Sequence, residues 1–340
     1  MNCLSFDQLK VVPESDQHTV AVAIANELTN ASALGDEVYA VFATGDTQVP
    51  VLDSLAALPI DWSKVGVFHL DEFVGIGIGH PASFARFIKE RIGDRVGISF
   101  DRLHLINGML DPEEECSRYS AELRDHVPDL CVLGIGGNGH LAFNEPGSMD
   151  DGEYRDLLRG VGSAQREGLP QEGESRGGVE LQEVESQEGG RGEREDLPKG
   201  VIHRERGYRE GRLQEGGLTG GGEKLVDIPL QEPGGLQGGG YRTKWPLVKV
   251  VHLDEQTRLR QVKEGLFGNI DEVPSMAVTL SMTSILSAKC IIAVCTGEHK
   301  ANVVRDLLKD DISPDCPASL LRLHDNATLF LDHAAASKLG

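Results

Sequence analysis

The sequence predicts an α/β protein built on a single doubly wound, mainly parallel β-sheet with helices on both faces. Short apolar runs rich in Val, Ile and Leu alternate with helix-like segments along most of the 340 residues. Several of the runs end in a turn that contains glycine, as the strands of parallel sheets often do. The alternation stops once, at residues 151–244, and then resumes.

The expected elements follow from apolar spacing and from helix start signals. In the first part of the chain the predicted strands are residues 37–43, 65–70, 103–106 and 130–136. The predicted helices there are residues 16–30, 49–58, 80–92 and 112–126. Further along, strands are predicted at 249–253, 277–282, 290–295 and 327–332. Helices are predicted at 257–267, 283–287 and 301–309, with another beginning at Pro317.

Residues 151–244 have a different composition from the rest of the chain. Residues 151–240 hold 23 of the 41 glycines and no Cys, Met, Phe or Trp, and similar Leu-Gln-Glu and Gly-Gly patterns recur in them. Such a segment cannot bury enough apolar surface to offset the entropy of ordering it. We therefore expect a disordered insertion at 151–244, and one discontinuous domain made of residues 1–150 and 245–340.

The net charge of −21 argues against nucleic acid or an anionic membrane as the main partner. Within the insertion acids outnumber bases, which also disfavours an RNA-binding Arg/Gly segment. The six cysteines have no Cys-x-x-Cys spacing, so structural thiols in a reducing compartment are expected rather than disulfides. The N-terminus lacks the features of a secretion signal, and no apolar run approaches the ~20 residues that span a bilayer. A soluble, cytoplasmic protein is predicted.

The most informative stretch is residues 130–147, where an apolar strand ends in glycines and then presents Asn138, His140, Asn144 and Glu145. Active sites of α/β proteins lie at such strand ends. His140 can exchange protons near neutral pH, and Glu145 could orient it. A loop histidine bonded to the backbone is the alternative.

The same stretch matches the dinucleotide-binding pattern, as Gly134-x-Gly136-x-x-Gly139 after a strand. That pattern requires a helix to begin within it. Here the chain runs into Asn144-Glu145-Pro146-Gly147, which breaks helices, so a nicotinamide or flavin site is disfavoured.

Two other strand ends carry polar residues. Asp71 and Glu72 follow the strand at 65–70 directly and could be a solvated cap or a catalytic base. Residues 44–47, Thr-Gly-Asp-Thr, lie between a strand and a helix, where backbone N–H groups can bind phosphate, although an ordinary turn has the same pattern. No compact metal-ligand spacing and no Gly-x-Ser-x-Gly motif occurs.

Three segments, LDEFVGIGIGHPASF, LGIGGNGHLAFNEPG and TGEHKANVV, together with PASLLRLH and ATLFLD, resemble the glucosamine-6-phosphate deaminase/isomerase family in order and spacing. The related 6-phosphogluconolactonases share the fold. The resemblance covers nearly all of 1–150 and 245–340. It implies conversion of glucosamine 6-phosphate and water to fructose 6-phosphate and ammonia, in amino-sugar catabolism, without a metal or organic cofactor. Members are often homo-oligomers.

The resemblance also implies roles for single residues. Asp71 would move a proton between C2 and C1 of the open-chain sugar, and His140 would open the ring, held by Glu145 and Asn138. A loop of Thr44, Gly45, Asp46 and Thr47 would bind the 6-phosphate by its backbone, and Lys300 would add positive charge.

Three positions depart from the family pattern. Asn138 stands where Asp is frequent, Asp46 introduces an acid into the phosphate loop, and Gly265 replaces a common arginine. Arg258 or Arg260 could replace that arginine if the helix presents it to the site. The alternatives to a deaminase are therefore a 6-phosphogluconolactonase-like hydrolase and a sugar-phosphate-binding paralogue without turnover.

Overall fold

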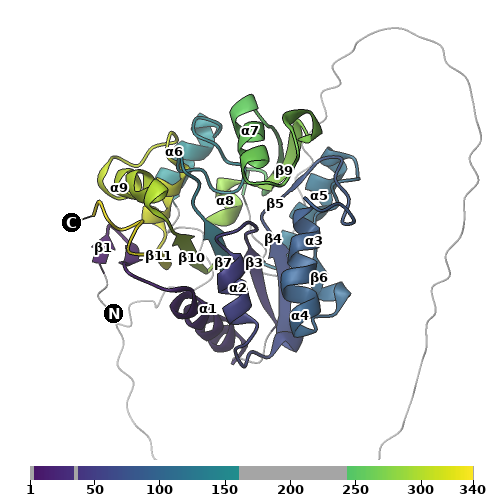
Figure 1. Cartoon of the computed structure of the whole chain (residues 1–340), viewed down its shortest axis with the longest axis horizontal. Helices are drawn as coiled ribbons and strands as arrows, with labels where there is room; N and C mark the ends of the chain where they lie inside the picture. The colour runs from purple at the N-terminus through teal and green to yellow at the C-terminus, as the bar shows by residue number, and fades with distance from the viewer. Residues whose placement is uncertain (1–3, 34–36, 161–242, 340) are drawn as a thin grey trace, which may run out of the picture. The chain divides into compact units, whose positions relative to one another are not determined.

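The structure, a computed structural model, describes residues 4–33, 37–160 and 243–339. An eight-stranded sheet has the order β1-β2-β11-β10-β7-β3-β4-β6 (Figure 1). Its strands are β1 (Leu4–Phe6), β2 (Leu9–Val12), β3 (Val38–Phe42), β4 (Val65–His69), β6 (Leu103–His104), β7 (Leu130–Gly134), β10 (Cys290–Cys295) and β11 (Ala327–Leu331). Every neighbouring pair is parallel except β1 with β2. The predicted mainly parallel sheet is confirmed.

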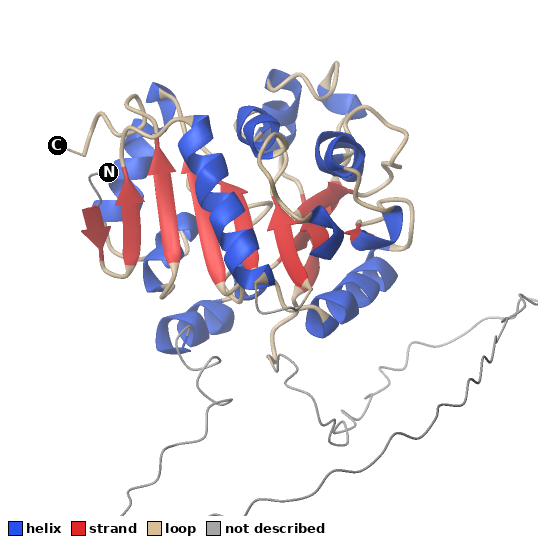
Figure 2. Cartoon of the chain, turned by 90° about the horizontal axis from the view of Figure 1, so that it is seen from below, coloured by secondary structure: helices blue, strands red, loops and turns tan. Residues whose placement is uncertain are grey.

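Helices cover both faces of this sheet, as expected for a doubly wound fold (Figure 2). In β7, Leu130 and Val132 pack into one hydrophobic core, while Cys131 and Leu133 pack into another. Successive strand residues point to opposite faces, so the two cores lie on the two sides of the sheet. The first core includes side chains of α1 (Gln17–Ser32) and α2 (Val49–Leu55). The second includes those of α5 (Pro112–Asp125), α8 (Met282–Ile285) and α9 (Ala301–Lys309).

Helix starts follow the capping signals in the sequence. The Asp16 carboxylate accepts a hydrogen bond from the Thr19 amide at 2.7 Å and caps α1. Asp111 caps α5 in the same way, with Pro112 at the first helical position. The remaining helices are α3 (Phe84–Ile88), α4 (Asp94–Val96), α6 (Asp151–Gly160) and α7 (Glu255–Lys263); Lys89–Gly93 is a π-turn, and 3₁₀ turns occupy Trp62–Lys64, Phe100–Arg102, Ile270–Glu272, Glu298–Lys300 and Pro317–Leu323.

A second, three-stranded antiparallel sheet corrects the prediction of a single sheet. It consists of β5 (Asp71–Phe73), β9 (Met276–Leu280) and β8 (Val248–His252), in that order. The segments at 249–253 and 277–282 are strands as expected, but they pair with each other rather than with the main sheet. Strand periodicity identifies a strand and not its neighbour. The partly exposed β8 is typical of an antiparallel edge strand.

Two further differences concern the ends of predicted segments. β1 and β2 form an N-terminal antiparallel pair that apolar spacing did not predict. Residues 151–160, predicted as part of the insertion, form α6, and Glu153 and Leu157 are buried there. Glu153 accepts hydrogen bonds from the amide and hydroxyl of Thr283. The composition averaged over ninety residues did not reveal this short amphipathic helix. Most of the predicted insertion lies outside the described residues.

Strands from both sides of residues 161–242 share one sheet, because β7 and β3 lie beside β10 and β11. We propose that residues 161–242 interrupt one domain. Replacing them with a short Gly/Ser linker is expected to leave the melting temperature within about 3 °C of the intact chain, because the strands on both sides are kept and the composition of the replaced residues offers little apolar surface to bury. The comparison is a deletion that starts at residue 151. It removes the buried Glu153 contacts and should lower Tm by at least about 5 °C. Equal losses in the two deletions would contradict the proposal.

Candidate active site

The turn after β7 is shaped by two glycines that allow close approach. A β-carbon at Gly136 would lie 2.0 Å from the nearest atom of the His140 imidazole. Gly139 has a positive φ of 88°, and a β-carbon there would meet the Cys316 sulfur at 2.7 Å. The Gly136 amide donates to the His140 carbonyl at 3.0 Å, which closes the turn. No helix begins within this stretch, so the dinucleotide pattern lacks its structural context.

His140 lies among three polar side chains. Its Nδ1 is 2.6 Å from Asn138 Oδ1, and the Asn138 amide in turn donates to Glu145 Oε2 at 2.7 Å. Arg260, from α7, donates to Glu145 Oε1 at 3.0 Å and has its Nη1 2.9 Å from His140 Nδ1. The Asn138 oxygen only accepts, which favours the imidazole proton on Nδ1, whereas the Arg260 guanidinium only donates and opposes a proton there. With the proton on Nδ1, the lone pair of Nε2 faces Arg260 Nη1 at 3.4 Å.

Burial controls the protonation of this group. It is the main cause that lowers the pKa of His140 to about 4; Glu145 opposes the lowering, and the nearby charges of Arg260 and Lys300 add to it. Burial also acts to raise the pKa of Glu145, but His140, Arg260 and Asn138 together lower it below its ordinary value. The pair at neutral pH is therefore a neutral imidazole beside a carboxylate.

Asp71 and Glu72 form β5, where the chain leaves the main sheet and enters the small one. Both are buried. Glu72 accepts hydrogen bonds from the amides of Phe73, Phe84 and Ala85 and from the Ser83 hydroxyl, so it is fully satisfied as a carboxylate. Burial, and secondarily the charge of Glu72, raises the pKa of Asp71 to about 8. Asp71 is thus a carboxyl that exchanges its proton near physiological pH.

Thr279 links the two acid–base groups. It pairs with Asp71 across the β5–β9 ladder, and its hydroxyl accepts a hydrogen bond from the Phe143 amide in the turn that carries His140. The two groups therefore belong to adjoining elements at the carboxyl ends of β4 and β7.

The predicted phosphate loop, residues 44–47, follows β3 and leads into α2. Gly45 has φ 106°, and Asp46 is exposed. Gln48, next in the chain, is buried against Gly134, and neither of its amide heteroatoms has a hydrogen-bond partner among the described residues.

Lys300 follows β10 and precedes α9. Its ammonium group donates to the Ile135 carbonyl in the His140 turn at 2.6 Å, and burial lowers its pKa. Glu264 joins the groups electrostatically: burial raises its pKa, Arg260 and Lys300 lower it, and Asp46 raises it. Asp46 in the loop, Lys300 and Arg260 thus all act electrostatically on Glu264.

Arg260 was one of two alternatives in the sequence, and the structure distinguishes them. Arg258 donates to the carbonyls of Ile270 and Val273, away from His140. Helix residues two apart point in different directions, so one of the pair faces the site and the other does not. Thr257, whose hydroxyl donates to Glu145 at 3.2 Å, gave no signal in the sequence.

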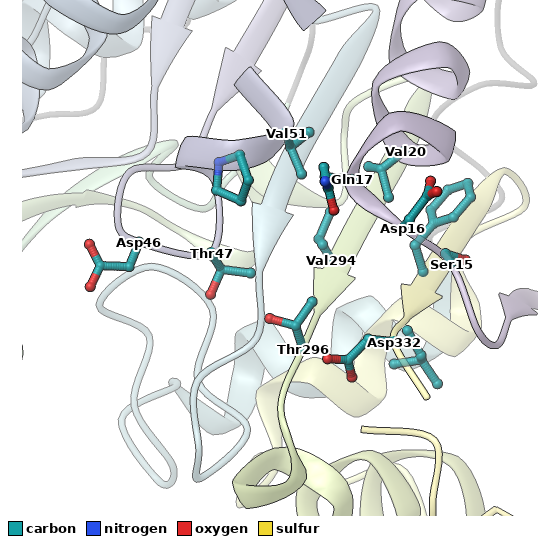
Figure 3. A pocket seen from close by; sticks show the side chains of 13 residues that line it. Ser15, Asp16, Gln17, Val20, Asp46, Thr47, Val51, Val294, Thr296 and Asp332 are labelled. Carbon is teal, nitrogen blue, oxygen red and sulfur yellow. The ribbon is translucent and has the colours of Figure 1, made fainter. Parts of the chain in front are cut away.

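A cavity of about 410 Å³ lies beside the loop (Figure 3). Asp46 and Thr47 form part of its wall, and the rest comes from the starts of α1 and α2 and the ends of β10 and β11. Asp71, His140 and Lys300 do not line it. In the described part of the chain no group of three or more His, Cys, Asp or Glu side chains could hold a metal ion. Among those same residues no helix has the length and apolar character needed to cross a membrane.

The fold and site define an α/β protein that gathers acid–base groups and cations at the carboxyl edge of a parallel sheet. The sequence profile of the family described as glucosamine-6-phosphate isomerases/6-phosphogluconolactonase matches residues 13–153. A glucosamine-6-phosphate deaminase of Bacillus pumilus is 26% identical over 99% of this chain and 99% of its own. Glucosamine-6-phosphate deaminase 1 of Giardia intestinalis is 44% identical over 119 residues, covering 33% of this chain and 45% of its own.

Solved structures show the same fold. A monomeric glucosamine-6-phosphate deaminase superposes with a TM-score of 0.62 at 24% identity, covering 96% of this chain and 99% of its own. The 6-phosphogluconolactonase of Thermotoga maritima gives 0.55 at 17% identity, covering 94% and 98%. The chain is therefore similar in sequence to glucosamine-6-phosphate deaminases over nearly its whole length, and it shares its fold with these solved structures.

The contact between Asn138 and His140 predicts how a substitution of Asn138 changes the pKa of His140. Asn138→Asp places a carboxylate beside Nδ1, which favours the imidazolium, so the pKa of His140 should rise from about 4 by roughly 1–3 units. Titration of the imidazole C–H protons by NMR measures it. Asn138→Ala removes the hydrogen bond without adding charge and should leave the pKa depressed. An unmoved His140 titration in Asn138→Asp would contradict this geometry.

Proposed function

We propose that this chain is a glucosamine-6-phosphate deaminase. The observation that carries the proposal is Asp71, a buried strand-end carboxyl whose pKa is raised to about 8 and which adjoins the element bearing a neutral His140. Removal of a proton from carbon needs a base of this strength, held out of water. The relatives over nearly the full chain are glucosamine-6-phosphate deaminases, which are enzymes acting on a sugar phosphate.

The reaction starts with ring opening. His140 Nε2 takes the proton of the O1 hydroxyl and returns a proton to the ring oxygen as the C1–O5 bond breaks, giving the open-chain aldehyde. Asn138 Oδ1 accepts a hydrogen bond from Nδ1–H and favours the tautomer that leaves Nε2 unprotonated. Glu145 stabilises the imidazolium that forms, because its carboxylate is held 3.7 Å from Nδ1.

Asp71 then acts on carbon. Its carboxylate removes the C2 proton while the aldehyde oxygen O1 takes a proton from the C2 ammonium group, which gives a neutral enol-amine. The Asp71 carboxyl then returns its proton to C1, which produces a protonated imine at C2. Water adds to C2 and ammonia leaves, so that fructose 6-phosphate is the product. Burial, and secondarily the charge of Glu72 beside it, keeps Asp71 basic.

Binding of the phosphate would use the amides of residues 44–47 together with Lys300 and Arg260. Lys300 and Arg260 both exert electrostatic influence on Glu264, as does Asp46 in the loop. A dianionic phosphate at this place gains from the two cations and is repelled by the two acids. The arrangement therefore supports binding of a sugar phosphate while limiting its affinity. Formation of a homo-oligomer and a cytoplasmic location stay predictions.

A coupled assay distinguishes the candidate functions. Ammonia release from glucosamine 6-phosphate at millimolar concentration is expected, with little hydrolysis of 6-phosphogluconolactone. The reverse result would establish the hydrolase instead, for which Asp71 has no role as a carbon base. Calorimetric binding of the sugar phosphate with neither activity would identify a paralogue that binds without turnover.

Asp71→Asn should lower kcat by about 10²–10⁴-fold because it removes the base, while KM changes little. The wild-type kcat/KM should rise with pH through about 8, since the carboxyl must lose its proton to act. The folded state holds that proton more tightly than the unfolded state, so stability falls as pH rises from 3.8 toward 8. Asp71→Asn is thus expected to melt no lower than wild type at pH 8. Retained turnover would exclude Asp71 as the base.

Asp46→Ser should lower KM for the phosphorylated substrate about three- to tenfold, with kcat unchanged, because it removes a like charge worth roughly 1 kcal/mol near the phosphate. Steady-state kinetics at low ionic strength measure it. Asp101→Ser, an exposed acid in the 3₁₀ turn before β6, makes the same change in net charge and should leave KM as it is. An equal response of the two variants would mean that Asp46 acts only through net charge.

A further inference from the structure

His69 is buried at the point where β4 ends and β5 begins. Its side chain has no exposed surface, and a single residue, Leu70, separates it from Asp71. β4 belongs to the main sheet and β5 to the small one. The chain passes from the main sheet to the small sheet between His69 and Asp71. This short connection therefore sets the direction in which Asp71 enters the site, and His69 is its first residue.

The hydrogen bonds of His69 fix its tautomer. Its Nε2 lies 2.9 Å from the backbone nitrogen of Ile106, which can only donate, so Nε2 accepts. The proton must then lie on Nδ1, which is 2.9 Å from the carbonyl oxygen of Asp71 and donates to it. One imidazole thus connects the segment after β6 to the backbone of Asp71.

His69 is itself held rigidly. Tyr119, fully buried in α5, accepts a hydrogen bond from the His69 amide and contacts the His69 carbonyl oxygen, both at 2.9 Å. The His104 ring does not contact it but stacks on neighbouring Phe68. Burial lowers the pKa of His69 to about 4, so the ring is neutral. A neutral donor can orient the Asp71 peptide without placing a positive charge beside the carboxyl.

We propose that His69 is a positioning residue for the base: its Nδ1–H holds the Asp71 carbonyl and thereby aims the Asp71 carboxyl into the site. The inference rests on the proposed function, since it concerns the carbon base of that reaction. A histidine that were merely part of the core would need only its packing and the bond to Ile106. The bond to Asp71 is the one that turnover depends on.

Two substitutions separate the two bonds. In His69→Asn the amide nitrogen lies near the Nδ1 position and can donate to Asp71, while the bond to Ile106 is lost. In His69→Gln the amide oxygen reaches the Nε2 position and can accept from Ile106, while the bond to Asp71 is lost. Each variant gives up one buried hydrogen bond, so both should lose similar stability.

Turnover should nevertheless differ. We expect His69→Asn to keep kcat within about threefold of wild type and His69→Gln to lower it at least about thirtyfold, with KM within about threefold in both, because small misplacement of a catalytic group costs up to about 10²-fold. Ammonia release and thermal melting are measured on the full chain. Equal kcat in the two variants, or a larger loss in His69→Asn, would overturn the proposal.

A measurement on the wild-type protein tests the proposal even if the variants do not fold. Long-range ¹H–¹⁵N NMR of the imidazole reports the tautomer, and Nδ1–H is expected. Finding the proton on Nε2 would overturn the proposal without any variant. If wild type releases no ammonia at all, the proposed function itself fails, and with it the base that His69 would position. If the wild type releases ammonia and the two variants have equal kcat, only the positioning role of His69 is overturned.

Discussion

Two neighbouring carboxyls buried side by side, Asp71 and Glu72, set the electrostatics on which the site depends. Burying one carboxylate is costly unless hydrogen bonds replace its water. Burial raises the pKa of Glu72, and four such bonds, two of them from backbone amides at the start of α3, oppose that rise. Asp71 has to bear both its own burial and the charge of Glu72, and its pKa rises to about 8. Burial and the neighbouring charge therefore act together on Asp71, the group that we propose as the base.

That arrangement constrains the surrounding backbone. The carbonyl of Asp71 is held by His69, and the strand that contains it pairs with β9. Gly108 has to approach closely, because a β-carbon there would lie 2.2 Å from the Phe73 carbonyl oxygen. The small antiparallel sheet continues the chain directly from the end of β4. It turns the chain after β4 so that a carboxyl follows the strand without pointing to bulk water.

The sequence predicted those parts that local chemistry determines. The strand before Gly134, the glycine turn and the grouping of Asn138, His140 and Glu145 all lie within sixteen residues, so spacing was informative. Contacts between distant segments were harder to foresee. Arg260 reaches Glu145 across 115 residues, and nothing in its own helix distinguishes it from Arg258. The small sheet escaped prediction for the same reason, since β8 and β9 are ordinary strands whose partners are set by tertiary packing.

Gly265 shows how a departure from a family pattern can follow from the fold. Its φ is 78°, and it follows the last residues of α7. The Gly265 amide donates to the Val262 carbonyl and the Leu266 amide to the Gln261 carbonyl, which is the pairing of a glycine-terminated helix. A side chain at that position would be strained, so an arginine there would require a different helix end. The cation comes instead from Arg260, more than one turn earlier on the helix, where it meets Glu145 and His140. Because the Arg260 guanidinium lies 2.9 Å from His140 Nδ1, its positive charge also favours the neutral form of the imidazole. In the proposed reaction the same cation helps to bind phosphate, so anion binding and proton transfer would be coupled through one side chain.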